Sequence, residues 1–196
     1  MNERHSNGPI KELRLGLVCY GGVSLAIYMH GITKEIHKLV TASNAYESSG
    51  AGSEDPVNPF DEATSEHVYW ELLKAQEAKT GIRTRVVVDV ISGTSAGGIN
   101  GIFLAKALAH NLSQQSLRDL WMDKGDIKKL LRGWGWLPLW SKAPWFAGSA
   151  ILKRGNIEPP LRGTEMCTWL FGALKDMDNT TSKNGSTLIA EGNSLE

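Results

Sequence analysis

The sequence predicts an α/β fold: a three-layer sandwich with a mostly parallel sheet and a helical, tryptophan-rich cap after Leu112. Two apolar runs, Leu13–Cys19 and Val86–Ile91, have the length and the aliphatic, partly β-branched composition of buried strands. Each run leads into a glycine-containing turn and then into a segment typical of a helix, Ser24–Val40 after the first and Ala96–Ala109 after the second. Strands that alternate with helices along the chain are typical of α/β proteins.

Length and composition are those of one globular domain. The chain has 196 residues, of which 41% are hydrophobic and 21% are charged, and this is enough for one sizeable core. We assign residues 1–12 to a polar N-terminal tail and residues 13–196 to the domain. Residues 41–65 are rich in Ser, Gly, Asp, Glu and Pro, which predicts a flexible surface insertion, with a lid as the alternative. A second helix, Glu66–Lys79, is expected to follow the insertion.

Charge and cysteine content argue against several classes of protein. The formal net charge is zero, so the composition does not indicate a nucleic-acid partner. Cys19 and Cys167 are too few for a disulfide framework, and the polar N-terminus lacks the apolar stretch of a signal peptide, so we expect a cytoplasmic protein. The uncharged run Leu15–Ile32 contains glycines, a serine and a histidine, which favours a buried strand, turn and helix over a membrane span.

A Gly-x-Ser-x-Gly pattern, Gly93-Thr94-Ser95-Ala96-Gly97, lies between the second expected strand and its helix. Strand, sharp turn and helix are the setting of a nucleophile elbow, where a strained serine presents its Oγ above a helix N-terminus. The flanking glycines are needed because backbone segments crowd there and a Cβ would clash. Ser95 is therefore the candidate nucleophile, and the alternative is an ordinary glycine-rich turn of an α/β domain.

A second glycine turn, Gly21-Gly22, connects the first expected strand to its helix. Backbone N–H groups that are free at the start of a helix suit the negative charge that develops on an ester oxygen during acyl transfer. Gly21, Gly22 and Val23 are therefore the candidates for an oxyanion hole. The alternative is a plain connection between a strand and a helix.

Together and in this order, the two motifs resemble the patatin-like phospholipase family, and the divergent first loop is similar to that of a bacterial patatin-related subgroup. The resemblance extends from Leu13 to Leu108. It implies a serine acyl hydrolase that acts on lipid esters through a Ser–Asp dyad, with Ser95 as the nucleophile and no metal or organic cofactor. Two residues depart from the family pattern: Val23 stands where a third glycine is usual, and Leu25 stands where Arg or Lys is usual.

The aspartate of that dyad, which the family carries in Asp-Gly-Gly or Asp-Gly-Ala, has no counterpart here, because the sequence contains no Asp-Gly. Histidine does not replace it, since only His110 follows Ser95 and it lies about 22 Å away along the same expected helix. His30 and His37 have no further ligands nearby for a metal site. We therefore expect an N-terminal fragment, inactive by itself, whose catalytic aspartate lies beyond Glu196. The aspartates that follow the serine are expected to be surface charges: Asp119, Asp123, Asp126, Asp176 and Asp178.

Residues 121–146 combine tryptophans with cations, glycines and prolines. Tryptophan favours the membrane–water interface and cations favour anionic headgroups, so this segment is a candidate for peripheral membrane contact. The alternative is that the tryptophans fill the core of the helical cap while the cations face water. The residues concerned are Trp121, Trp134, Trp136, Trp140, Trp145, Lys128, Lys129 and Arg132.

Two functions follow from the sequence. The first is a serine ester hydrolase that acts on lipids, with a lipid ester as substrate and no nucleic-acid partner. The second is a catalytically inactive lipid-binding or interaction module on the same fold, which Leu25 and the missing aspartate favour.

Overall fold

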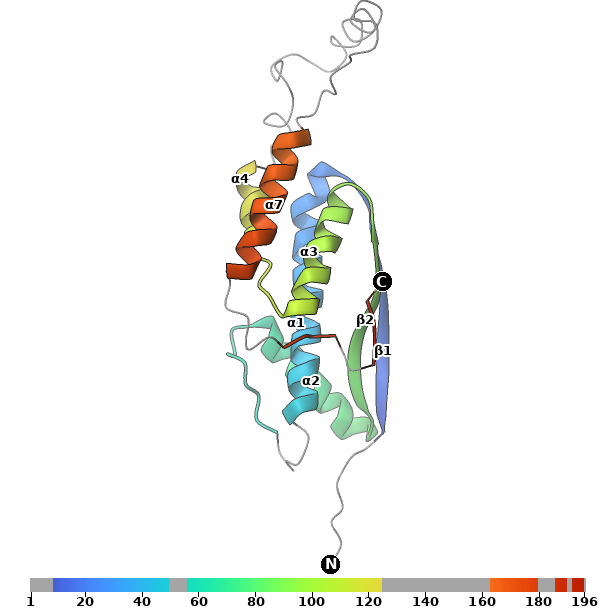
Figure 1. The fold of residues 1–196 in the computed structure, drawn as a ribbon. Coiled ribbons are helices and arrows are strands. Elements are labelled where there is room, and N and C mark those ends of the chain that lie inside the picture. The colour runs from blue at the N-terminus through green and yellow to red at the C-terminus, as the bar shows by residue number, and fades with distance from the viewer. Residues whose placement is uncertain (1–8, 50–55, 125–162, 180–185, 190–191, 196) are drawn as a thin grey trace, which may run out of the picture.

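The structure is a computed structural model that describes residues 9–49, 56–124, 163–179, 186–189 and 192–195. Two strands and five α-helices are assigned in this part of the chain, together with one 3₁₀ turn (Figure 1). The elements are β1 (Ile10–Cys19), the 3₁₀ turn η1 (Val23–Leu25), α1 (Ala26–Ser49), α2 (Ser65–Thr80), β2 (Arg83–Gly93), α3 (Ala96–His110), α4 (Gln115–Lys124) and α7 (Gly163–Asn179).

The two strands pair in parallel, with α1 and α2 between them in the chain. Ile10 lies opposite Arg83 and Cys19 lies opposite Gly93, so both strands end at the same edge of the sheet. One irregularity in the register, after Leu15, separates the two halves of the ladder. The predicted α/β fold with parallel pairing is confirmed, and β1 begins three residues before the expected Leu13.

One hydrophobic core lies between the sheet and the helices that cover one of its faces (Figure 1). Leu15 and Leu17 of β1 pack against a cluster of buried side chains from β2, α1 and α3. On the other face, Val18 and Val90 are exposed. The described residues therefore form two of the three predicted layers. The buried members of this cluster are Val40, Val86, Val88, Leu104, Leu108 and Leu188.

Helix α1 is longer than the sequence predicted, and it contains residues 41–49 of the expected flexible insertion. The polar composition of this stretch is misleading because its inward side is buried. The Ser43 hydroxyl accepts a hydrogen bond from the backbone N–H of Val86 at 2.9 Å, and Tyr46 packs edge-on against Trp70 with ring centroids 5.2 Å apart. Residues 41–49 are therefore helical and do not form an irregular loop, and residues 50–55 lie outside the described residues.

The helical cap is represented by α4 and α7, which pack together beside α3. Trp121 is buried there against Phe103, Leu117 and Met177, so this tryptophan belongs to the core. The other tryptophans of the 121–146 segment lie outside the described residues. Among the helices of the described part, none is long and apolar enough to cross a membrane.

Candidate active site

The carboxyl ends of β1 and β2 bring the two sequence motifs together (Figure 1). Each strand turns there into a helix, β1 through residues 20–25 and β2 through Thr94 and Ser95. The backbone N–H of Thr94 donates to the carbonyl oxygen of Cys19 at 3.1 Å, which joins the two turns directly at their base. Residues separated by more than seventy positions in the chain therefore meet at one edge of the sheet.

Ser95 has an unusual backbone conformation, with φ 51° and ψ −126°. Among the described residues, Asn111 is the other non-glycine residue at positive φ, and it has the left-handed geometry that asparagine tolerates at a helix end. The ψ of Ser95 lies outside that left-handed region, so the conformation is strained, by about 1–3 kcal/mol for such sites. The serine is exposed, and α3 begins at the next residue, Ala96.

The glycines two residues before and after Ser95 allow three backbone segments to touch. A Cβ on Gly97 would lie 2.1 Å from the carbonyl oxygen of Cys19, and a Cβ on Gly93 would lie 2.7 Å from the backbone of Gly97. These separations are too short for any side chain, so the turn between β2 and α3 requires glycine at both positions. The requirement for glycine that the sequence pattern suggested thus has a steric basis in this structure.

The Gly21-Gly22 turn lies against the serine. A Cβ on Gly21 would be 3.0 Å from the Cβ of Ser95, and the Gly21 N–H donates to the Thr94 hydroxyl at 3.0 Å. Gly22 has φ 153°, which glycine adopts without strain, and its carbonyl accepts the Leu25 N–H that closes η1. Within the described residues, the N–H of Gly22 has no hydrogen-bond partner, whereas that of Gly21 is occupied.

A buried asparagine that sequence analysis did not identify supports this arrangement. Asn100 lies in the second turn of α3 and is fully buried. Its side-chain amide donates to the carbonyl oxygens of Ala26 at 3.2 Å and Ala96 at 3.0 Å, so it connects the first turns of α1 and α3. The available signal in the sequence was a single polar residue within the apolar stretch Ala96–Ala105, five positions after the serine.

In the described part of the chain, the Ser95 hydroxyl has no hydrogen bond to an acid or a histidine. Asp119 bonds to Gln115 and Arg118, and Asp178 forms an ion pair with Lys106 at 2.7 Å. Asp123 and Asp176 line a groove between α4 and α7, and Asp126 lies outside the described residues.

The histidines also lie away from Ser95. His110 is exposed at the end of α3, the helix that begins after Ser95. His30 is buried within α1, and burial lowers its pKa. Burial lowers the pKa of His37 to about 4, although a hydrogen bond to the Ala107 backbone has the opposite, smaller effect. Both rings are therefore neutral near pH 7. No cluster of metal-ligating side chains is found among the described residues. At the edge of the sheet itself, burial raises the pKa of the Cys19 thiol.

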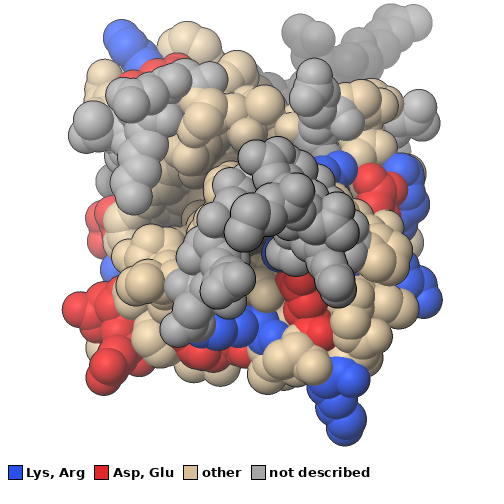
Figure 2. Space-filling view, turned by 90° about the horizontal axis from the view of Figure 1, so that it is seen from below, with Lys and Arg blue, Asp and Glu red and all other residues tan. Residues whose placement is uncertain are grey.

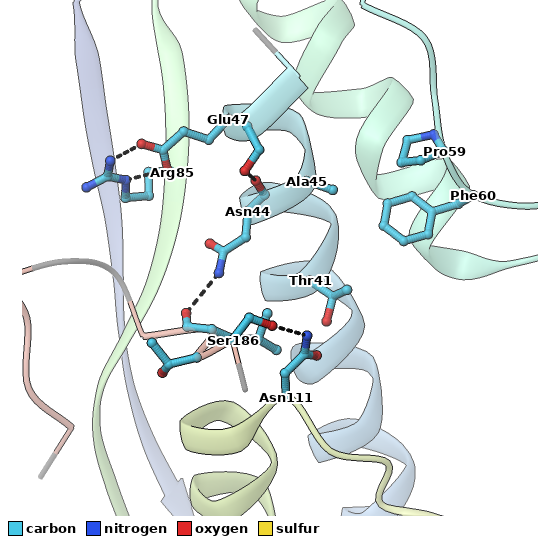
Figure 3. Close-up of a pocket in the computed structure, with 12 residues that line it drawn as sticks. Thr41, Asn44, Ala45, Glu47, Pro59, Phe60, Arg85, Asn111 and Ser186 are labelled. Atoms are coloured by element: carbon cyan, nitrogen blue, oxygen red, sulfur yellow. Dashed lines mark hydrogen bonds and ion pairs between the residues drawn. The ribbon is translucent and has the colours of Figure 1, made fainter. Parts of the chain in front are cut away.

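A hollow of about 500 Å³ near the opposite end of the sheet is a competing site (Figure 3). Its polar groups already bind one another. Arg85 pairs with Glu47, the Asn44 side chain donates to the carbonyl oxygen of Leu188 at 3.0 Å, and Asn111 donates to the Ser186 hydroxyl at 3.1 Å. The edge that carries Ser95 is therefore the better candidate for an active site.

Comparison with known proteins identifies a family and a relative. The family model described as patatin-like phospholipase matches residues 66–190. The chain is 38% identical over 122 residues to the uncharacterized membrane protein Rv3479 of Mycobacterium tuberculosis. This match covers 62% of the chain but 11% of the relative, so the chain spans a small part of that protein's length. No solved structure matches the chain significantly.

Proposed function

The chain belongs to the patatin-like phospholipase family, and from this premise we propose that it is a serine acyl hydrolase of lipid esters with Ser95 as its nucleophile. The observation that carries the proposal is the strained backbone of Ser95 between a strand end and a helix start. Glycine-only positions on both sides support the assignment of a nucleophile elbow. The exposed position leaves the hydroxyl open to a substrate.

The proposed reaction is a two-step acyl transfer. The Ser95 Oγ attacks the ester carbonyl carbon while its proton passes to a general base, and the carbonyl electron pair moves onto the oxygen. Collapse of this intermediate expels the alcohol, which takes up the proton, and leaves an acyl-serine that water then hydrolyses. The first turn of α3 places the positive end of a helix dipole beneath the reacting oxygens.

Backbone N–H groups would stabilise the negative oxygen. Gly22 and Val23 fit this role because they directly follow Gly21, which contacts the Ser95 turn, and because N–H groups at the start of η1 are not used by a helix ladder. Ala96, as the first residue of α3, offers a further N–H of the same kind. Leu25 supplies no cation, so the proposed hole consists of backbone groups.

We assign the general base to an aspartate outside these 196 residues, which completes a Ser–Asp dyad. The absence of Asp-Gly from the sequence and the other partners of Asp119 and Asp178 support this assignment. General-base assistance contributes about 10²–10⁴-fold, so we expect residues 1–196 alone to be inactive. We also retain the proposal of peripheral membrane contact through residues 121–146, which rests on their cations and on the tryptophans other than the buried Trp121.

The experiment uses the full-length protein and an alkyl fluorophosphonate, which reacts with activated serines. The wild-type protein should be labelled at Ser95 and should hydrolyse a lipid ester, and Ser95→Ala should lose both properties. Ser92→Ala is the matched control, because Ser92 is an exposed serine at the end of the same strand, and it should keep both. Absence of labelling and hydrolysis in a folded wild-type protein would favour the inactive lipid-binding module instead.

A further inference from the structure

Thr94 contacts each backbone segment that forms the candidate site. Its N–H donates to Cys19 at the end of β1, and its carbonyl accepts the N–H of Gly97 in α3 at 2.9 Å. Its hydroxyl accepts the N–H of Gly21 at 3.0 Å. The first two are backbone contacts, which any residue could make, whereas the third depends on a hydroxyl group at this position.

The hydrogen bond between Gly21 and Thr94 determines how the first turn lies beside the serine. It joins Gly21 itself to the turn before α3, in addition to the bond from Thr94 to Cys19 at the base of the two turns, whereas the bond at Gly22 closes η1 within its own segment. The two turns are in close contact here: a Cβ on Gly21 would lie 3.0 Å from both the Ser95 Cβ and the Thr94 carbonyl oxygen. A small shift of this turn would therefore change the space in front of Ser95.

The same hydrogen bond occupies one of the three N–H groups expected to form the oxyanion hole. An N–H that already donates at 3.0 Å to a fixed hydroxyl is not available to a second acceptor without losing the first. The N–H groups of Gly22 and Val23 remain. The predicted set of three donors is thus divided into one anchoring group and two groups open to a substrate.

We propose that Thr94 is a positioning residue: its hydroxyl holds Gly21 so that the N–H groups of Gly22 and Val23, not that of Gly21, meet the ester oxygen beside Ser95. This inference rests on the proposed function. Removing one donor from an oxyanion hole lowers kcat by about 10²–10³-fold. Loosening the turn leaves the donors present but poorly placed, so we expect a loss of about 10–100-fold, smaller than complete removal.

The test compares Thr94→Val with Thr94→Ser in the full-length protein. Valine keeps the β-branched shape and removes the hydroxyl, whereas serine keeps the hydroxyl and removes the methyl group. We expect Thr94→Val to lower kcat for a short-chain ester by about 10–100-fold with KM unchanged, and Thr94→Ser to stay within about threefold of wild type. Both variants should melt within about 2 °C of wild type, because the residue is exposed.

Amide hydrogen exchange at Gly21 provides a readout that does not depend on activity. Exchange should be slow in wild type and Thr94→Ser and should become at least about tenfold faster in Thr94→Val, since the hydrogen bond is then absent. Wild-type kcat in Thr94→Val, or equal losses in both variants with a parallel loss of melting temperature, would overturn the positioning role. Failure of the proposed function is distinguishable, because it appears as full hydrolysis by Ser95→Ala or as no hydrolysis by the folded wild-type protein.

Discussion

The two ends of the sheet are held in different ways. At the carboxyl end, backbone segments contact one another directly, whereas near the amino end long side chains connect the strands to the helices. Around Ser95, the contacts that define the shape involve glycines, and a single added Cβ would meet carbonyl or backbone atoms at 2.1–2.7 Å. The Leu15–Thr33 part of the chain, which forms this edge, contains no charged residue. The shape of the candidate site therefore depends on the absence of side chains at these glycines as well as on the groups that are present.

Near the amino end, ion pairs join the elements. Arg83 donates hydrogen bonds to Glu77, which also accepts a hydrogen bond from the Tyr46 hydroxyl. Arg85 donates to Glu47 at the rim of the hollow (Figure 3). Figure 2 shows acidic and basic side chains interspersed on the face viewed from this end. Long side chains can shift to accommodate a change, whereas crowded backbone cannot. Substitutions should therefore have severe effects at the carboxyl end and mild effects at the amino end.

The largest effect is expected from Gly97→Ala. The new Cβ would overlap the carbonyl oxygen of Cys19, so α3 must move away from β1 and the Ser95 turn must distort. We expect fluorophosphonate labelling of the full-length protein to fall by more than about 100-fold, as for a displaced catalytic group. The melting temperature should also fall, because overpacking costs about 1–3 kcal/mol.

Gly31→Ala is the matched control for this substitution. Gly31 also lies in a helix, α1, and a Cβ there would have no atom within 4 Å. Alanine should keep wild-type labelling and stabilise the helix by about 0.5–1 kcal/mol. Wild-type labelling in Gly97→Ala would show that the backbone contact is not needed at the candidate site.

The sequence was sufficient to predict the strand, turn and helix around Ser95, because glycine spacing and β-branched residues are local signals. It was not sufficient to show that the Thr94 hydroxyl binds Gly21, a contact between residues 73 positions apart. That contact exists because the parallel register places Cys19 opposite Gly93, and no local pattern specifies the register. The role of Asn100, which connects the first turns of α1 and α3, depends on tertiary structure in the same way.

The length of α1 illustrates a second limit of sequence analysis. Residues 41–49 contain serines and an asparagine, which favour loops when judged one at a time. Burial of Ala42 and Tyr46, together with the bond from Val86 to Ser43, outweighs these weak local preferences. Helix propensities are differences of less than about 1 kcal/mol per residue, so tertiary contacts readily override them.

An intermediate effect is expected from Glu77→Gln at the amino end. The hydrogen bond from Arg83, followed by that from Tyr46, lowers the pKa of Glu77 below its usual 4.5, against the opposing effect of burial. Because the folded state binds the proton less readily, the carboxylate stabilises the protein above pH 4.5, and this stabilisation is lost as the pH falls. The substitution should cost about 1–2 kcal/mol at pH 7.

Urea unfolding at pH 7 and pH 3.5 measures this difference. The gap between wild type and Glu77→Gln should narrow at the lower pH, since the stabilisation by the carboxylate is lost as the pH falls below 4.5. Labelling of Ser95 at pH 7 should not change. Glu77 lies at the end of α2 beside the amino end of β2, whereas Ser95 follows the carboxyl end of that strand. An equal gap at both pH values would show that the charge of Glu77 does not stabilise this end.

The smallest effect is expected from Glu47→Gln in the rim of the hollow. Arg85 keeps a second carboxylate, Glu12, at 3.6 Å, and both members of the Arg85–Glu47 pair are partly exposed, with 21% and 28% of their side chains accessible. Pairs of this kind contribute about 0.2–1 kcal/mol, so we expect a loss near 0.5 kcal/mol in dilute buffer. Because salt screens exposed charges, the loss should become negligible at about 1 M NaCl. A loss of stability above about 2 kcal/mol that persists in salt would contradict the comparison. The amino end of the sheet would then be as sensitive to substitution as the turns around Ser95.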